Sequence, residues 1–412
     1  MRTGILIVGL STRAIAESAV RGGHQVVTLD YFGDRDQREL VENHALLRDP
    51  TLIGETCPSF SAAALEQASR SLDFESVVYI SNLENHPEVV EELAQGRVLL
   101  GNAPTVLYQV RDWRTLRAFC HEVGVACPHT LLAGEGAAAD GGNRWLRKPV
   151  RSGGGHGVQP WDGRPLGQSH FLQAYVEGRP ASAAFVADGK RCVVIGLTEQ
   201  LIGRGELGAQ GFGWCGNILP LAGGDNESGK ERRGEGAQRT APWKDEGLAV
   251  LEEVERMAAA LTRRFGLRGV NGLDLIVARD RDGGPRAILV EVNPRYTASM
   301  ELVERAYGLN IFSLHVEAMD GRLPDFRLAE HLYARGLWFA KGIVYARRPV
   351  TMPETGGWVK RGRRDIPFPG ERIEAGHPVC TVLAEGEGRD TCWQHLLAGV
   401  ADVRQEIGDL TE

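Results

Sequence analysis

The sequence predicts an open α/β domain, then an α+β region, and last a small β-rich tail. Three observations support this order. Apolar runs at 5–8 and 26–29 flank a helical pattern and form a βαβ unit at the start. A long helical pattern over 244–265 precedes two apolar strands, 272–278 and 287–292, joined by a turn-rich segment. After about residue 330 the chain consists of short apolar pieces between Gly and Pro.

Composition indicates an ordinary globular protein of several domains. The chain has 412 residues, 42% hydrophobic and 25% charged. A net charge of -7 provides no overall positive field for nucleic acid or an anionic membrane. No stretch approaches the roughly 20 apolar residues of a membrane span, and the first apolar run is too short for a signal peptide. Seven cysteines without a C-x-x-C pair argue against a disulfide framework or zinc site, so we expect a cytoplasmic protein.

The first turn argues against dinucleotide binding. It reads Gly9-Leu10-Ser11-Thr12-Arg13-Ala14 and lacks the second and third glycines of G-x-G-x-x-G. Further along, 77–80 predicts another buried strand, and 86–93 predicts a helix with a proline in its first turn. A helix near 111–123, ended by Gly124, leads into the second region.

The strand pair near residue 290 predicts a metal site. Glu291 and Asn293 are two apart on one strand, so their side chains share a face, and Asp274 lies on the partner strand. Carboxylate and amide oxygens of this kind suit Mg²⁺. The alternative is a solvated polar face, but the strands are strongly apolar around these positions. We therefore predict that Asp274, Glu291 and Asn293 bind metal.

A glycine-rich loop after Lys148 predicts a phosphate site. Four glycines in six residues allow backbone N–H groups to approach phosphate oxygens, and Lys148 adds a point charge. The P-loop pattern is absent, and a solvent-facing Lys148 is the alternative. The predicted nucleotide contacts in this loop are Ser152, Gly153, Gly154, Gly155, His156 and Gly157.

A strand-like segment, 171–178, offers a third element. It ends in a glycine turn and could present backbone groups to an adenine edge and a carboxylate to a ribose. Its predicted nucleotide contacts are Gln173, Tyr175, Val176 and Glu177. Alone, it is only a strand and a turn.

Together, these motifs resemble the ATP-grasp superfamily, which includes D-alanine ligases, biotin carboxylase and carbamoyl-phosphate synthetase. Strand-Lys-Pro, a glycine loop, Q-x-Y-V-x-G, G-L-D and E-V-N-P-R occur in this order. The last element, with its upstream Asp, is specific, and the others are supportive. The tail, 365–382, is similar to a carboligase-like branch, some members of which accompany methanofuran or methanopterin coenzyme pathways.

The resemblance implies a domain order. A Rossmann-like pre-ATP-grasp domain would span 1–110, and a small ATP-grasp subdomain would span 111–185. A larger subdomain with the metal site would span 186–330, and a β-rich C-terminal domain would span 331–412. ATP would lie between the two ATP-grasp subdomains.

The resemblance also implies roles. Lys148 would contact the α-phosphate and adenine region, and Gly153–Gly157 would cover the β- and γ-phosphates. The three metal ligands would hold one or two Mg²⁺ or Mn²⁺ ions. Arg295, with Asn293, would be catalytic and would neutralise the transferring phosphoryl group.

Two departures from the family pattern leave questions open. Family members often carry a Lys just after the Asp that opens the second domain. Asp112 has no such neighbour, so Arg111 or Arg114 substitutes for it or the contact is missing. The usual ribose acid aligns with Pro180, which leaves Glu177 as the candidate.

The implied activity is that of an ATP- and magnesium-dependent ligase that forms an acyl phosphate from a carboxylate and transfers it to an amine or other nucleophile. The expected partners are small-molecule carboxylates and amines, without nucleic acid or membrane, and a homodimer is the assembly considered. One alternative is a biotin-carboxylase-like enzyme that uses bicarbonate. Another is a nucleotide-binding regulatory subunit without turnover.

Two glycine-rich segments complete the expectations. The first, 203–217, carries Phe212 and Trp214 and is a candidate lid or substrate contact, with an ordinary surface hairpin as the alternative. The second, 223–240, has no apolar period and is expected to be a surface loop.

Overall fold

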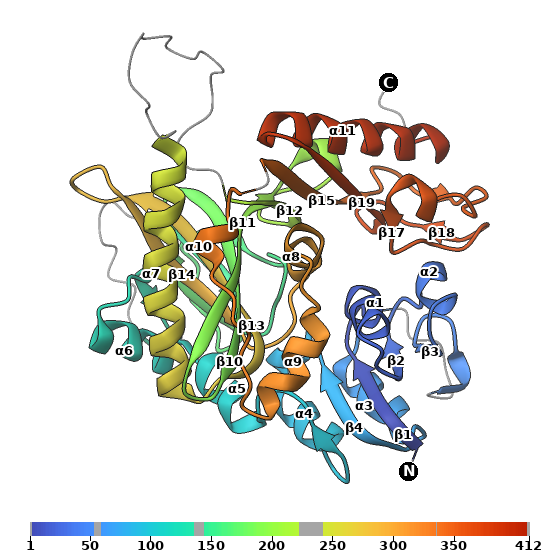
Figure 1. Ribbon diagram of the computed structural model, residues 1–412, viewed down its shortest axis with the longest axis horizontal. Coiled ribbons are helices and arrows are strands. Elements are labelled where there is room, and N and C mark those ends of the chain that lie inside the picture. Colours follow the sequence, from blue (N-terminus) through green and yellow to red (C-terminus); the bar gives the residue numbers. More distant parts are fainter. Residues whose placement is uncertain (1, 53–58, 136–143, 222–241, 335, 410–412) are drawn as a thin grey trace.

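The computed structural model describes residues 2–52, 59–135, 144–221, 242–334 and 336–409, so the segment 223–240 lies outside the described residues. Five parallel strands form the first sheet, in the order β3-β2-β1-β4-β5 (Figure 1). The strands are β1 (Arg2–Val8), β2 (Val26–Asp30), β3 (Asn43–Ala45), β4 (Phe74–Tyr79) and β5 (Val98–Leu99). The accompanying helices are α1 (Arg13–Arg21), α2 (Arg35–Arg38), η1 (Pro50–Leu52), α3 (Ala62–Ser69), η2 (Leu83–Asn85), α4 (Pro87–Leu93) and α5 (Pro104–Val110).

Helices on both faces explain why β1 reads as a continuous apolar run. Leu6, Ile7 and Val8 are fully buried, as expected for a central parallel strand covered on both sides. The predicted βαβ start is confirmed.

A four-stranded sheet follows, in the order β6-β9-β7-β8. Its strands are β6 (Thr130–Leu131), β7 (Trp145–Pro149), β8 (Gln159–Pro160) and β9 (His170–Ala174). Helix α6 (Trp113–Val123) precedes it. Asp112 caps α6 by accepting the N–H groups of Arg114 and Thr115, and Gly124 ends it with φ 71°.

The largest sheet has eight strands, in the order β14-β13-β10-β11-β12-β15-β19-β17. They are β10 (Arg179–Asp188), β11 (Cys192–Ile202), β12 (Trp214–Leu219), β13 (Arg268–Arg279), β14 (Pro285–Asn293), β15 (Leu337–Tyr345), β17 (Arg363–Arg364) and β19 (Pro378–Glu387). The strands β16 (Val350–Thr351) and β18 (Arg372–Ile373) form a separate pair. The tail therefore extends this sheet.

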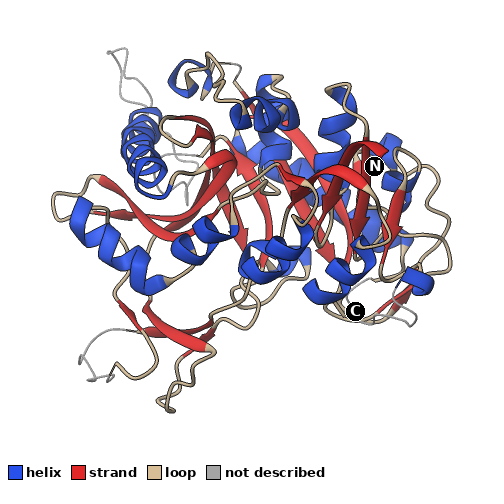
Figure 2. Ribbon diagram, turned by 90° about the horizontal axis from the view of Figure 1, so that it is seen from below, coloured by secondary structure: helices blue, strands red, loops and turns tan. Residues whose placement is uncertain are grey.

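Helices cover both faces of this sheet, as Figure 2 shows from below. They are η3 (Gly205–Leu207), α7 (Pro242–Phe265), α8 (Met300–Tyr307), α9 (Ile311–Met319), α10 (Leu328–His331), η4 (Val359–Arg361) and α11 (Arg389–Glu406). The apolar stripe predicted on α7 packs against the sheet, with Val254 and Leu261 fully buried beside Leu273 and Leu289. On the other face, α9 lies between β13 and α1 and joins the two sheets.

One helix of the tail was not expected from the sequence. The 18-residue helix α11 covers β19 and β15 and buries Cys392, Leu396, Val400 and Val403 against them. The fold class is otherwise the predicted one, an α/β domain followed by an α+β region with a β-rich end. Among the described residues, no helix is both long enough and apolar enough to cross a membrane.

Candidate active site

The two predicted metal-binding carboxylates face each other across β13 and β14. Asp274 pairs directly with Glu291, and the register shifts by one residue immediately afterwards, as in a β-bulge. Asp274 accepts hydrogen bonds from Asn293 and, at 2.9 Å, from Gln200 Nε2. Burial and the negative charge of Glu291 raise the pKa of Asp274 to about 6, although those hydrogen bonds oppose the shift. Two carboxylates held this closely favour a cation between them.

Arg111 is the arginine that reaches these carboxylates. Its Nη1 donates to Glu291 and, at 3.0 Å, to the carbonyl oxygen of Val292. The side chain of Arg111 is 13% exposed, whereas that of Arg114 is 66% exposed and lies 3.7 Å from Glu135. Of the two substitutes considered for the missing lysine, the structure brings Arg111 into the site.

Arg295 lies beside the same strand end. Its Nη2 lies 2.6 Å from Glu84 Oε1 and 3.4 Å from Asn293 Oδ1, and its Nη1 donates to the carbonyl of Tyr296. The backbone next to it is fixed, because Pro294 O accepts from the hydroxyl of Tyr79 and from Asn102 Nδ2. Arg295 is thus held by the parallel sheet as well as by its own loop.

Sequence reasoning missed Glu84. This residue lies in η2, just after β4, at the carboxyl ends of the parallel strands, where open α/β sheets bind their ligands. Burial alone would raise the pKa of the Glu84 carboxyl, but the charges of Arg295 and Arg111 outweigh it and lower the pKa below the ordinary value. An acid within a few residues of the carboxyl end of an apolar strand was the signal that could have found it.

Lys148 on β7 reaches Gln173 on the neighbouring strand β9. Its Nζ donates to Gln173 Oε1 at 2.6 Å, and Gln173 in turn donates to Thr130 Oγ1 at 3.3 Å. Burial lowers the pKa of Lys148, while the charges of Glu291 and Asp274 oppose the shift. The lysine ammonium therefore belongs to the same electrostatic environment as the carboxylates.

The glycine loop is held from two sides. Asn85 Nδ2 donates to Ser152 O at 3.2 Å from one side, and the backbone N–H of Trp214 donates to Gly154 O at 2.9 Å from the other. A side chain at residue 155 would come within 1.9 Å of the carbonyl oxygen of Phe212, and φ there is +77°, so only glycine fits. Segment 203–217, the candidate lid, thus packs directly on the glycine loop.

The turn after β9 is more exposed. Glu177 is 85% exposed and lies 3.8 Å from Arg144, whose guanidinium stacks on the Tyr175 ring at 4.1 Å. Val176 lies between them in the same turn. The predicted nucleotide contacts of Tyr175, Val176 and Glu177 stay predictions.

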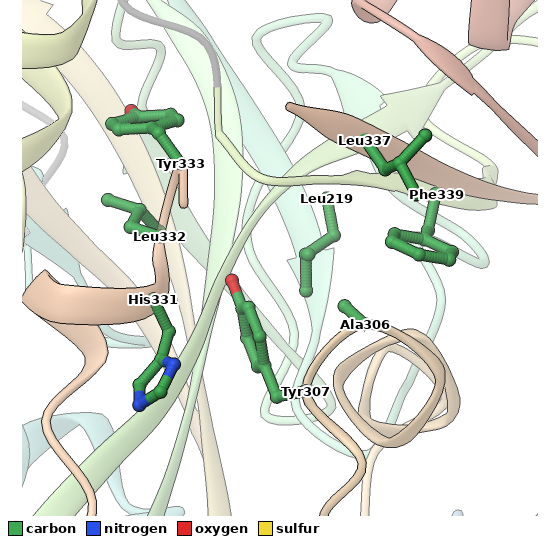
Figure 3. A pocket seen from close by; sticks show the side chains of 8 residues that line it. All are labelled: Leu219, Ala306, Tyr307, His331, Leu332, Tyr333, Leu337 and Phe339. Atoms are coloured by element: carbon green, nitrogen blue, oxygen red, sulfur yellow. The ribbon is translucent and has the colours of Figure 1, made fainter. Parts of the chain in front are cut away.

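A small cavity lies elsewhere, between α8 and β15 (Figure 3). It is lined by Leu219, Ala306, Tyr307, His331, Leu332, Tyr333, Leu337 and Phe339. None of these is a predicted site residue. The lining is mostly apolar and contains neither Lys nor Arg.

A sequence profile of the ATP-grasp domain matches residues 111–299. That segment is an ATP-grasp domain. It contains Lys148, the glycine loop, the carboxylate pair and Arg295, so the predicted site residues lie inside the matched segment. No curated protein is significantly similar to the chain in sequence.

Solved structures share the fold of the ATP-grasp domain and its flanking regions. Pyruvate carboxylase from Rhizobium etli is 15% identical with a TM-score of 0.66, and the match covers 98% of this chain but only 37% of that one. The biotin carboxylase domain of 2-oxoglutarate carboxylase from Hydrogenobacter thermophilus, in complex with MgADP and bicarbonate, is 14% identical with a TM-score of 0.65, covering 93% and 86%. L-Amino acid ligase from Bacillus licheniformis is 15% identical with a TM-score of 0.62, covering 98% of each chain. Identities this low establish the shared fold alone.

The residues of the ATP-grasp domain fit a hard divalent cation. Among the described residues, no group of three or more His, Cys, Asp and Glu side chains is arranged to hold a metal. The trio of Asp274, Glu291 and Asn293 instead supplies two carboxylates and one amide, a set that suits Mg²⁺ when nucleotide phosphates and water complete its shell.

Proposed function

We propose that the protein is an ATP-dependent ligase that phosphorylates a carboxylate and transfers the resulting acyl group to an amine, releasing ADP and phosphate. One observation carries the proposal: the opposed carboxylates Asp274 and Glu291 lie among three cationic side chains, Lys148, Arg111 and Arg295. Neighbouring carboxylates and cationic side chains suit a metal ion together with the polyphosphate that it accompanies.

Each part of the site takes a role in the first step. Lys148 and the glycine loop bind the phosphates of ATP, and Asp274, Glu291 and Asn293 would hold Mg²⁺ or Mn²⁺. That ion, when bound, supplies charge neutralisation at the phosphate oxygens. A carboxylate oxygen of the substrate attacks the γ-phosphorus, and the bond from that phosphorus to the ADP oxygen breaks. Arg295 stabilises the charge that develops on the transferring group.

The second step forms the product. The amine nitrogen attacks the carbonyl carbon of the acyl phosphate, the carbon–oxygen bond to the phosphate breaks, and the nitrogen loses a proton. Water must be kept out because it would compete with the amine. Segment 203–217 supports this requirement: it is anchored by fully buried Leu207 and packs on the glycine loop.

The position of Arg111 weakens the regulatory alternative. That alternative drew on the missing lysine after Asp112, and Arg111 supplies a cation at the carboxylates instead. The carboxylase alternative keeps support from the shared fold with biotin carboxylase domains. The proposal also includes a role in coenzyme biosynthesis, a cytoplasmic location and a homodimeric assembly.

A substrate screen tests the proposal. The protein is incubated with Mg·ATP and pools of carboxylates, coenzyme precursors included, with and without a pool of amines, and ADP and phosphate are measured. We expect release that requires one carboxylate and one amine. Release with bicarbonate alone would favour the carboxylase alternative, and nucleotide binding without release in any pool would favour the regulatory one. Light scattering tests the homodimer.

A further inference from the structure

Two neighbouring residues of η2 each hold one of the site arginines. Glu84 Oε1 lies 2.6 Å from Arg295 Nη2, and Asn85 Oδ1 accepts from Arg111 Nε at 3.0 Å. Both arginines then extend to β14, where Arg111 reaches Glu291 and Arg295 reaches Asn293. A short helical turn of the parallel-sheet region is therefore connected to the metal-binding strand through two guanidinium groups.

The turn itself is firmly held. Leu83, Glu84 and Asn85 are 0%, 1% and 4% exposed. Leu83 packs in the core of the parallel sheet, and backbone hydrogen bonds run from Leu83 N to Ile80 O and from His86 N to Leu83 O. The carboxylate of Glu84 and the amide of Asn85 thus have little freedom, which makes them suited to fix a partner side chain.

The Glu84–Arg295 pair joins the parallel-sheet region to the ATP-grasp domain. Arg295 is 11% exposed, and its planar guanidinium contacts Glu84, Asn293 Oδ1 and the carbonyl of Tyr296, which together restrict its position and tilt. Among the described residues, Arg295 Nε is buried and has no hydrogen-bond partner. Without Glu84, the guanidinium would turn toward the carboxylates Asp274 and Glu291, whose charges also act on it.

We propose that Glu84 and Asn85 are positioning residues: Glu84 aims Arg295 at the transferring phosphoryl group, and Asn85 aims Arg111 at the nucleotide phosphates. The proposal rests on the proposed function, since it assumes that a nucleotide triphosphate binds beside β14. It assigns the parallel-sheet region a direct part in assembling the ATP site.

A binding cycle tests Glu84 without knowledge of the substrates. Calorimetry gives the dissociation constants of Mg·ADP and of Mg·AMP-PNP, and their ratio isolates the contribution of the γ-phosphoryl group. The ratio is measured for wild type, Glu84→Gln, Arg295→Lys and the double variant. Glu91→Gln, an exposed acid on nearby α4, is the matched control.

We expect Glu84→Gln to reduce the ratio about tenfold, while the affinity for Mg·ADP and the ratio of Glu91→Gln stay at the wild-type level. In the Arg295→Lys background, Glu84→Gln should have no further effect, because the group that it aims is gone. A wild-type ratio in Glu84→Gln, an equal loss of both nucleotides, or an effect that persists in the Arg295→Lys background would overturn the role of Glu84.

The second pair gives an independent cycle. Asn85→Ala, Arg111→Lys and the double variant are compared in the same way, with Mg·AMP-PNP affinity as the readout. This cycle decides the proposal if Glu84→Gln does not fold. The cycle is needed because Asn85 also donates to Ser152 O. Only the part of the Asn85→Ala effect that disappears in the Arg111→Lys background reports on the positioning of Arg111. Independent effects of the two substitutions would overturn the role of Asn85. A wild-type protein that binds no Mg·AMP-PNP would contradict the proposed function itself, and the positioning roles with it.

Discussion

Arg111 donates from Nη1 to the carboxylate of Glu291 and, at 3.0 Å, to the carbonyl oxygen of Val292 on the same strand. A positively charged side chain of the protein therefore already pairs with the carboxylate that is predicted to bind metal. In the proposed mechanism, a metal ion at Glu291 would repel this guanidinium, and the phosphates of the nucleotide would attract it.

Replacing Arg111 with Met should therefore weaken ATP binding about tenfold, as expected for loss of a partly buried charge-assisted contact. Arg114→Met is the matched control, because that side chain is 66% exposed and should change affinity little. Calorimetry with Mg·AMP-PNP measures both. If Arg114→Met weakened binding more than Arg111→Met, then Arg114 and not Arg111 would make the substitute contact.

Lys148→Met should weaken nucleotide binding while the fold persists, since the contact it loses within the protein is a hydrogen bond to Gln173. Lys190→Met, in the exposed turn between β10 and β11, serves as the control for removal of a lysine charge. Titration with Mg·AMP-PNP and a thermal melt separate binding from stability. Unchanged nucleotide affinity in Lys148→Met would contradict the phosphate role of the loop region.

Glu291→Gln keeps the size of the side chain but removes its charge, so the damage should fall on the chemical step. We expect ADP release to drop about a hundredfold, at ~1.4 kcal/mol per tenfold in rate. The melting temperature should change little, because Glu291 is 29% exposed and its pair with Arg111 is partly screened. Higher Mg²⁺ or added Mn²⁺ should recover part of the rate. A large loss of stability that metal does not restore would point to a structural role instead.

The buried ion cluster of Glu301 with Arg13 and Lys341 makes stability depend on pH. Burial alone would raise the pKa of Glu301, but the two cations outweigh it and lower the pKa well below its usual range. A depressed folded-state pKa stabilises the protein above the unfolded value of about 4.3, and this stabilisation is lost as the pH falls below it.

Urea unfolding of wild type and Glu301→Gln between pH 7 and pH 2 tests this effect, because the window in which the stabilisation is lost lies below the unfolded pKa of about 4.3. At neutral pH the variant should be less stable by about 3–5 kcal/mol, the usual cost of removing one member of a buried ion pair. The difference should shrink as the pH falls. Glu374→Gln, from an exposed pair with Arg372, is the control. A difference that stays constant across this range would contradict the assignment.

The hairpin was predictable because its signals are local. Glu291 and Asn293 share a face through strand periodicity, and the turn between β13 and β14 sets the register as far as Leu275. The β-bulge beyond it, which has no sequence signal, places Asp274 opposite Glu291 and not opposite Val290. The long helix α7 was equally accessible through its apolar spacing. Lys148 and the glycine loop followed from residue type and order.

The contribution of the parallel sheet was not predictable in the same way. Glu84 and Arg295 are distant in sequence, and only the packing of two domains brings them to 2.6 Å. Gln200 reaches Asp274 from β11, which is not its neighbour in the sheet. By contrast, α11 had a readable signal: Cys392, Leu396, Val400 and Val403 recur at helical spacing, but the Gly and Pro residues earlier in the tail obscured it.

The central claim, activation of a carboxylate as an acyl phosphate, is tested most directly by isotope transfer. The carboxylate found in the screen is labelled with ¹⁸O in its carboxyl group and incubated with Mg·ATP, the amine and the protein, and the released phosphate is analysed by mass spectrometry. The attacking carboxylate oxygen stays on phosphorus when the amine displaces phosphate, so the account predicts one ¹⁸O per phosphate, with ADP as the nucleotide product. Unlabelled phosphate, or AMP and pyrophosphate as products, would contradict it.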